Sequence, residues 1–156
     1  MTAIVYDFSE IGTEGGDRGV TSGTDALDSA VASGAAASIK AGQLCSYANG
    51  FWSVVADGGC NADGQYGLAL STSTDTAADD GLVQVARVKG GALKLRGAPT
   101  TSGNLAVGIL GDKVTLDVAA GVMTVDENDA NGVLLITNYD TTNGTIDFLL
   151  PYSVEA

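Results

Sequence analysis

Short runs of β-branched and aliphatic residues, separated by glycine-rich turns, follow one another from residue 38 to the end of the chain. Such closely spaced runs are typical of the antiparallel strands of a sandwich or barrel. Strands are expected at Tyr66–Leu70, Leu82–Lys89, Ala92–Arg96, Leu105–Leu110, Val133–Tyr139 and Thr145–Leu150. The pattern therefore predicts an all-β fold, a compact β-sandwich or a partly open β-barrel of short antiparallel strands.

The clearest hairpin signal is the dipeptide Asn49-Gly50, which lies between two apolar runs. Asn-Gly supplies the two positive-φ positions of a type I′ turn. This turn pairs Cys45 with Val54 and Tyr47 with Trp52, so we expect these four side chains on one face of the sheet.

A second hairpin is expected over Val114–Val125, centred on Ala119-Ala120. Because side chains alternate between the two faces of a strand, this centring separates an apolar set from a polar set. The inner set is Val114, Leu116, Met123 and Val125, and the outer set is Thr115, Asp117 and Thr124.

Residues 1–36 differ from the rest, because Ala, Ser, Gly and Thr dominate and few large apolar residues are available for a core. We interpret residues 1–36 as an extended N-terminal arm and residues 37–156 as the β-domain, which could consist of two small lobes, about 37–98 and 99–156. The tip of the arm is a β-type run in need of a sheet, and its candidate partner-binding residues are Ile4, Val5, Tyr6 and Phe8.

Composition narrows the function. The 156 residues include 19 acidic and 7 basic side chains, for a net charge of −12, and no histidine. Histidine is the usual acid–base group near neutral pH, so we expect no enzyme, no catalytic residue and no cofactor. The negative charge disfavours nucleic acid and anionic membranes as partners.

The first residues lack a basic segment followed by a long apolar run, so neither a signal peptide nor a membrane span is expected. We therefore expect synthesis in a cytoplasm. In that compartment Cys45 and Cys60 are favoured as two buried or half-buried thiols, and a disulfide between them is the alternative.

Two acidic loops, Asp57–Gly64 and Asp126–Gly132, contain oxygen ligands of the kind that Ca²⁺ prefers. The same residue types are common in turns without any metal. The turn interpretation is favoured, and no metal site is assigned.

Four of the seven basic residues lie in Arg87–Arg96, a run without an acidic residue. If Gly90-Gly91 is a hairpin turn, Arg87 lies opposite Lys94, and this like-charge pair costs stability unless an acidic surface approaches. The run is either a solvated face balanced by acids of neighbouring strands or a docking patch for an acidic partner, a second copy or a different subunit. The candidate residues of this patch are Arg87, Lys89, Lys94 and Arg96.

Three segments, Ile39–Cys45, Asn49–Gly59 and Tyr66–Leu70, together resemble capsid decoration (cement) proteins of tailed bacteriophages, including the phage lambda head-decoration type. The shared succession is a strand, a short turn, an apolar strand with Trp, an acidic glycine-rich loop and a Gly-led aliphatic strand. The resemblance implies a virion protein on the outer surface of an assembled capsid, commonly a homotrimer, that bridges neighbouring capsomers. The arm would then add a strand to the major capsid protein.

The alternative is an adhesion or carbohydrate-binding β-module of a phage fibre or tail accessory. Aromatic side chains could stack on a sugar, although aromatic residues in hairpins more often belong to a core or an interface. The candidate sugar-binding residues are Tyr47, Phe51, Trp52 and Tyr66.

Overall fold

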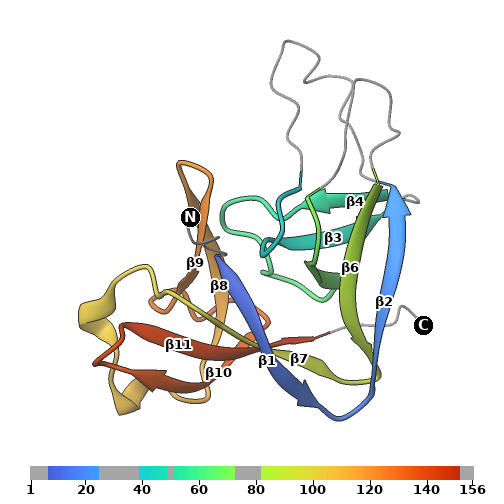
Figure 1. Ribbon diagram of the computed structural model, residues 1–156. Helices are drawn as coiled ribbons and strands as arrows, with labels where there is room; N and C mark the ends of the chain where they lie inside the picture. Colours follow the sequence, from blue (N-terminus) through green and yellow to red (C-terminus); the bar gives the residue numbers. More distant parts are fainter. Residues whose placement is uncertain (1–6, 25–38, 49–50, 73–81, 152–156) are drawn as a thin grey trace, which may run out of the picture.

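The computed structural model describes residues 7–24, 39–48, 51–72 and 82–151, which form two antiparallel β-sheets (Figure 1). Sheet A has the strand order β1-β7-β11-β10-β8-β9, and sheet B has the order β2-β6-β5-β3-β4. The strands of sheet A are β1 (Phe8–Glu14), β7 (Ala92–Gly97), β11 (Thr145–Pro151), β10 (Leu134–Asp140), β8 (Lys113–Ala119) and β9 (Val122–Asp126). The strands of sheet B are β2 (Asp17–Thr24), β6 (Leu82–Lys89), β5 (Tyr66–Ala69), β3 (Leu44–Ala48) and β4 (Phe51–Val54). The expected all-β fold is confirmed.

A bent two-stranded ribbon joins the sheets. One half of the ribbon is β1 followed by β2, and the other half is β6 followed by β7. Because β1 pairs with β7 and β2 pairs with β6, both halves pass from one sheet to the other at the same point. The bend depends on glycine, because Gly15, Gly16 and Gly90 have φ values of 61°, 66° and 77°. A Cβ atom on Gly91 would lie 2.5 Å from the carbonyl oxygen of Glu14.

Gly90-Gly91 is therefore a corner of the ribbon and not a hairpin turn, which was the condition for Arg87 to lie opposite Lys94. Arg87 lies opposite Gly19 of β2, whereas Lys94 lies opposite Gly12 of β1. The like-charge pair between Arg87 and Lys94 does not exist, because the two residues belong to different sheets.

The N-terminal segment is part of the globule. Phe8 is 1% exposed, and its ring packs edge to face on Phe148, with 5.2 Å between the ring centroids. The interpretation of residues 1–36 as an arm is therefore wrong for residues 8–24, which pair along their length with β7 and β6. Residues 1–6 and 25–36 lie outside the described residues.

One main core lies between the sheets, and strands of both contribute to it. Its largest fully buried members include Phe8, Phe148, Leu44, Leu93, Leu95, Leu116, Leu134 and Ile136. A smaller cluster on the other face of sheet B contains Ile39, Cys45, Trp52, Ala69, Val83 and Val85. Because β7 pairs with β11 and the core is shared, the chain does not divide into lobes near residue 98.

The hairpin of β3 and β4 is confirmed residue by residue, with Cys45 opposite Val54 and Tyr47 opposite Trp52. The Asn49-Gly50 turn itself lies outside the described residues. Cys45 and Cys60 are both buried thiols, as favoured from the sequence.

The hairpin of β8 and β9 is shifted by two residues from the expected register. Ala120 and Gly121 have φ values of 52° and 78°, so the positive-φ turn lies one position later than expected. A shift by an even number preserves the faces, and the expected inner set is buried. Thr115 was expected outside but is 2% exposed, and its hydroxyl donates a hydrogen bond to Asp129 at 3.0 Å.

The expected strand Leu105–Leu110 is wrong. This segment belongs to the loop between β7 and β8, residues 98–112, which contains two short 3-10 helices, η2 (Ser102–Asn104) and η3 (Val107–Ile109). The carboxylate of Glu127 accepts hydrogen bonds from backbone N–H groups at the start of this loop, which turns the chain away from the sheet. The other expected strands are confirmed to within one residue at each end.

Candidate partner-binding face

The outer face of sheet A, which points away from the core, carries a row of four side chains on four neighbouring strands. Lys94 of β7 lies opposite Leu149 of β11, Leu149 lies opposite Leu135 of β10, and Leu135 lies opposite Lys113 of β8. Directly opposed residues of antiparallel strands point to the same face. Two partly exposed leucines therefore lie between two lysines, and we call this set the Lys94–Lys113 row.

A groove of about 210 Å³ lies beside three members of this row, Lys113, Leu135 and Leu149. It is lined by Asp63, Ala92, Lys113, Val133, Leu135, Leu149 and Pro151. Apolar side chains dominate the lining, and Lys113 and Asp63 are its charged members. An apolar groove with a cation in its lining suits a protein segment that brings an apolar side chain and a carboxylate together.

The cations of this face differ in how they are neutralised. The ammonium group of Lys94 lies 3.2 Å from a carboxylate oxygen of Glu14, and Arg96 makes two hydrogen bonds to Asp147, of 2.8 and 3.0 Å. Lys113 is exposed, and it forms no ion pair within the described part of the chain. Lys113 is therefore the cation of this face that is available to an acidic partner.

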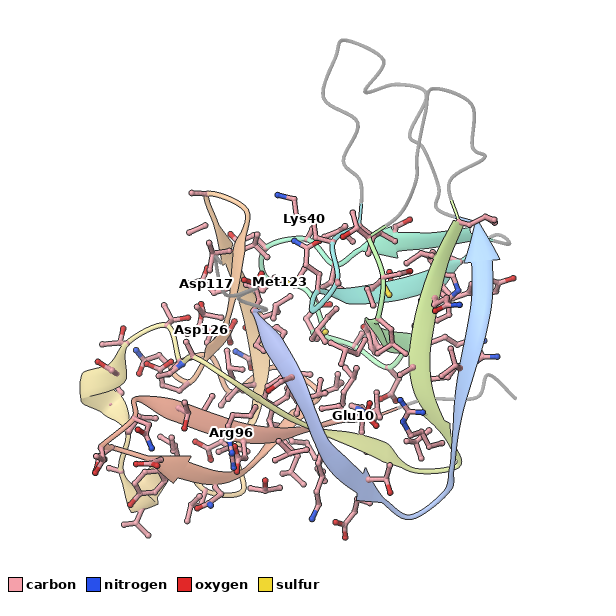
Figure 2. The ribbon with its side chains drawn as sticks, in the orientation of Figure 1. Glu10, Lys40, Arg96, Asp117, Met123 and Asp126 are labelled. Carbon is pink, nitrogen blue, oxygen red and sulfur yellow. The ribbon has the colours of Figure 1, made fainter. Side chains whose placement is uncertain are left out.

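The predicted basic patch is thus divided between the two sheets. Lys94 and Arg96 lie on sheet A, where acids of neighbouring strands balance them, as the solvated-face interpretation expected. Figure 2 shows Arg96 over the strands of sheet A. Arg87 is half-buried on sheet B, and the backbone of Lys89 lies opposite Asp17 in the same sheet.

The apolar candidates of the arm do not form a described site. Phe8 belongs to the core, so its expected role in partner binding is wrong. Ile4, Val5 and Tyr6 lie outside the described residues.

Sequence reasoning missed Lys113, Leu135 and Leu149. A signal for the two leucines was present, because Leu134–Ile136 and Phe148–Leu150 are apolar at three consecutive positions. Alternation then requires an apolar side chain on the outer face as well as on the inner one. Only the register between the strands brings these positions together with Lys113.

The alternative of a sugar-binding face is wrong for two of its four aromatic residues, which are buried as the favoured core interpretation expected. Trp52 is fully buried, and Tyr66 is buried with its hydroxyl donating to the carbonyl of Ala62 at 2.7 Å. Tyr47 is 39% exposed and packs against Trp52 with 5.1 Å between the ring centroids. The side chain of Phe51 lies outside what the structure describes.

Carboxylates of the two acidic loops act as structural hydrogen-bond acceptors. Asp57 accepts the backbone N–H of Val118 at 2.9 Å, and Asp129 accepts the side-chain amide of Asn131 at 2.8 Å. These contacts support the turn interpretation of the acidic loops. Burial raises the pKa of the Cys60 thiol to about 12, so this sulfur is protonated at neutral pH.

Asp117 and Asp57 share a hydrogen bond between β8 and the loop before β5. This bond, followed by burial, raises the pKa of Asp117, whereas the N–H of Val118 is the main cause that lowers the pKa of Asp57. Figure 2 shows Asp117 near Asp126 on the β8–β9 hairpin, and the charge of Asp126 also raises the pKa of Asp117. Asp117 is therefore the member of the pair that holds a proton more readily.

We predict that Asp117→Asn raises the melting temperature at neutral pH. The raised pKa favours the protonated acid in the folded state, so its stabilising effect is present at low pH and is lost as the pH rises through that pKa. An asparagine amide donates to Asp57 at every pH. Circular dichroism can monitor the thermal unfolding of both proteins. The melting temperature of Asp117→Asn should exceed that of the wild type by a margin that grows from about pH 4 to about pH 7. A difference that is independent of pH would contradict this account.

No family model, curated protein or solved structure matches the chain. Among the described residues, none forms a helix of the length and apolarity needed to cross a bilayer. The described residues form an all-β module whose outer face of sheet A carries an apolar surface flanked by lysines.

Proposed function

We propose that this protein is a non-catalytic structural protein of a tailed-phage virion. In this proposal it binds the outer surface of an assembled capsid and stabilises the shell by bridging neighbouring capsomers, with the major capsid protein and other copies of itself as partners. The sequence resemblance of Ile39–Cys45, Asn49–Gly59 and Tyr66–Leu70 to capsid decoration proteins supports the class. The Lys94–Lys113 row is the structural observation that carries the attachment.

The row suits an acidic protein surface. With a net charge of −12, most of this molecule repels such a surface, whereas the outer face of sheet A carries Lys113, which no carboxylate of the described residues neutralises. The two leucines at the centre of the row supply apolar area that loses water on contact, at about 25 cal/mol per Å². Charge steers the approach, and apolar burial holds the complex.

This attachment does not depend on an arm. Residues 8–24 already belong to the two sheets, so they do not form the free arm that was expected to add a strand to the capsid protein. Strand addition by Ile4, Val5 and Tyr6 stays a prediction. Attachment of several copies to one shell would slow release, because each bound copy raises the effective concentration of its linked neighbours.

We predict that Lys113→Glu weakens attachment to capsids that lack this protein. Lys40→Glu is the matched control, because this substitution changes the net charge equally. Lys40 is also exposed and lies on the segment before β3 (Figure 2). Loss and reversal of one contacting charge should cost about tenfold or more in affinity at low salt. Co-sedimentation at about 0.05 M and about 0.5 M NaCl would measure both variants.

Three outcomes separate the alternatives. Weaker binding of Lys113→Glu alone, with a gap that narrows at high salt, supports the outer face as the attachment surface. Equal loss in Lys113→Glu and Lys40→Glu would show that only net charge matters, and unchanged binding of both would contradict attachment through this face.

A further inference from the structure

Residues 98–111, which are all but the last residue of the loop between β7 and β8, carry no charged side chain, although charged residues make up 17% of the chain and acids outnumber bases by 19 to 7. They are bounded by Arg96 on β7 and by Asp112 before β8. In Figure 1 the loop, drawn in yellow, projects from one end of sheet A on the side away from sheet B. An uncharged projection is thus present on a strongly acidic molecule.

The loop is held in place by a buried carboxylate. Glu127 is 4% exposed, and its two oxygens accept hydrogen bonds from the backbone N–H of Thr100 at 3.1 Å and of Thr101 at 2.9 Å. The side-chain amide of Asn104 donates to the same carboxylate at 3.1 Å, and Leu105 is buried in the main core. A loop fixed in this way has little conformational entropy left to lose on binding.

The loop presents apolar side chains to solvent. Val107 is 74% exposed, the highest value among the described large hydrophobic residues, and Leu110 is 40% exposed. Both belong to the turn around η3, which is anchored by the N–H of Gly111 donating to the carbonyl of Ile136 at 2.9 Å. The structure therefore holds two apolar side chains in water on a rigid support.

We infer that this loop is the surface through which copies of the chain associate with one another. Two copies with a net charge of −12 each repel, so a contact that contains no carboxylate is the one with the smallest electrostatic cost. The uncharged loop offers such a surface, and apolar tips from two or more copies can bury one another. This inference deepens the proposed function, in which copies of the protein are partners, and rests on that part of it: it names the surface between the copies, and its test needs no capsid.

Association between acidic copies should depend on salt concentration in a characteristic way. Salt screens the repulsion between acidic copies, with a Debye length of about 8 Å at about 0.15 M and about 3 Å at about 1 M. Self-association through the loop should therefore strengthen as salt rises. Attachment through Lys113 should weaken over the same range, which distinguishes the two surfaces.

Val107→Asp is the test, and Val122→Asp is its matched control. Val122 is 51% exposed at the tip of the β8–β9 hairpin, so both substitutions place one acid at an exposed valine. Sedimentation equilibrium between about 0.05 M and about 1 M NaCl should show self-association of the wild type and of Val122→Asp, with Val107→Asp at least about tenfold weaker. Circular dichroism checks that both variants keep the wild-type fold.

A second measurement uses Val107→Cys. Because Cys45 and Cys60 are at most 1% exposed, the introduced thiol is the reactive one, and a short bis-maleimide should join two copies. Val122→Cys should be joined much less. The inference would be overturned if the wild type stayed monomeric at every protein and salt concentration. It would also be overturned if the Val107 and Val122 variants associated and were cross-linked to the same extent. Loss of capsid binding by Val107→Asp with a monomeric wild type would assign the loop to the capsid instead.

Discussion

Replacing both Leu135 and Leu149 by glutamine is expected to weaken capsid attachment by about 100-fold. The two side chains form the apolar centre of the Lys94–Lys113 row. Both are partly exposed, and a bound partner can cover the apolar area that each leaves in contact with water. A loss of about 1 to 2 kcal/mol for each leucine gives this factor, since about 1.4 kcal/mol corresponds to tenfold in affinity. Titration of capsids with labelled protein measures the change.

The control replaces two other partly or largely exposed leucines, Leu70 and Leu82, by glutamine. Leu70 is 38% and Leu82 is 61% exposed, and both belong to sheet B or its border. This variant should attach as the wild type does, provided that thermal unfolding shows that both double variants are folded. Equal loss of attachment in the two variants would mean that general surface hydrophobicity, not the outer face of sheet A, determines binding.

Replacing Phe8 by alanine is expected to lower the free energy of unfolding by about 3 to 5 kcal/mol. The residue lies near the N-terminus, yet its ring is 1% exposed and packs on Phe148 in the main core. Folded domains have about 5 to 15 kcal/mol in total, so the variant should be close to unfolding. Urea denaturation gives the value directly.

Ile11→Ala is the matched control on the same strand, because Ile11 is 41% exposed. It should change the free energy of unfolding by less than about 1 kcal/mol. Combining Phe8→Ala with Phe148→Ala should reveal a coupling of about 0.5 to 1.5 kcal/mol between the two rings. If Phe8→Ala left the stability unchanged, residue 8 would belong to a free arm after all.

The sequence predicted those elements whose signal is local. The β3–β4 hairpin follows from a two-residue turn with a strong conformational preference, and its register was correct. The β8–β9 register was two residues out because the positive-φ pair is Ala120-Gly121, and alanine at the first position weakens the turn signal. Its buried face was still correct, since an even shift preserves alternation.

The bent ribbon could not be predicted in the same way. A Gly-Gly pair permits a hairpin turn and a corner equally well, and only the pairing of β1 with β7 decides between them. That pairing joins residues about 80 positions apart, which no local pattern encodes. The small residues of β1 and β2 led to the prediction of an arm, because Phe8 is the one large apolar side chain that the described residues of these two strands contribute to the core.

The candidate binding face has the same non-local origin. Lys113, Leu135 and Leu149 are separate in sequence, and the register of β8, β10 and β11 places them in one row. Residue types alone selected Lys94 and Arg96 but grouped them with Arg87 and Lys89, which lie in the other sheet. A run of three apolar residues in a strand is the sequence feature that would have indicated an apolar outer face.

A reconstruction of capsids decorated with this protein, at a resolution that shows side chains, tests the central claim most directly. Our account predicts that the outer face of sheet A rests on the shell, with Lys113 facing an acidic residue of the capsid protein and with Leu135 and Leu149 covered. A map in which this face points to solvent while another surface contacts the shell would contradict it.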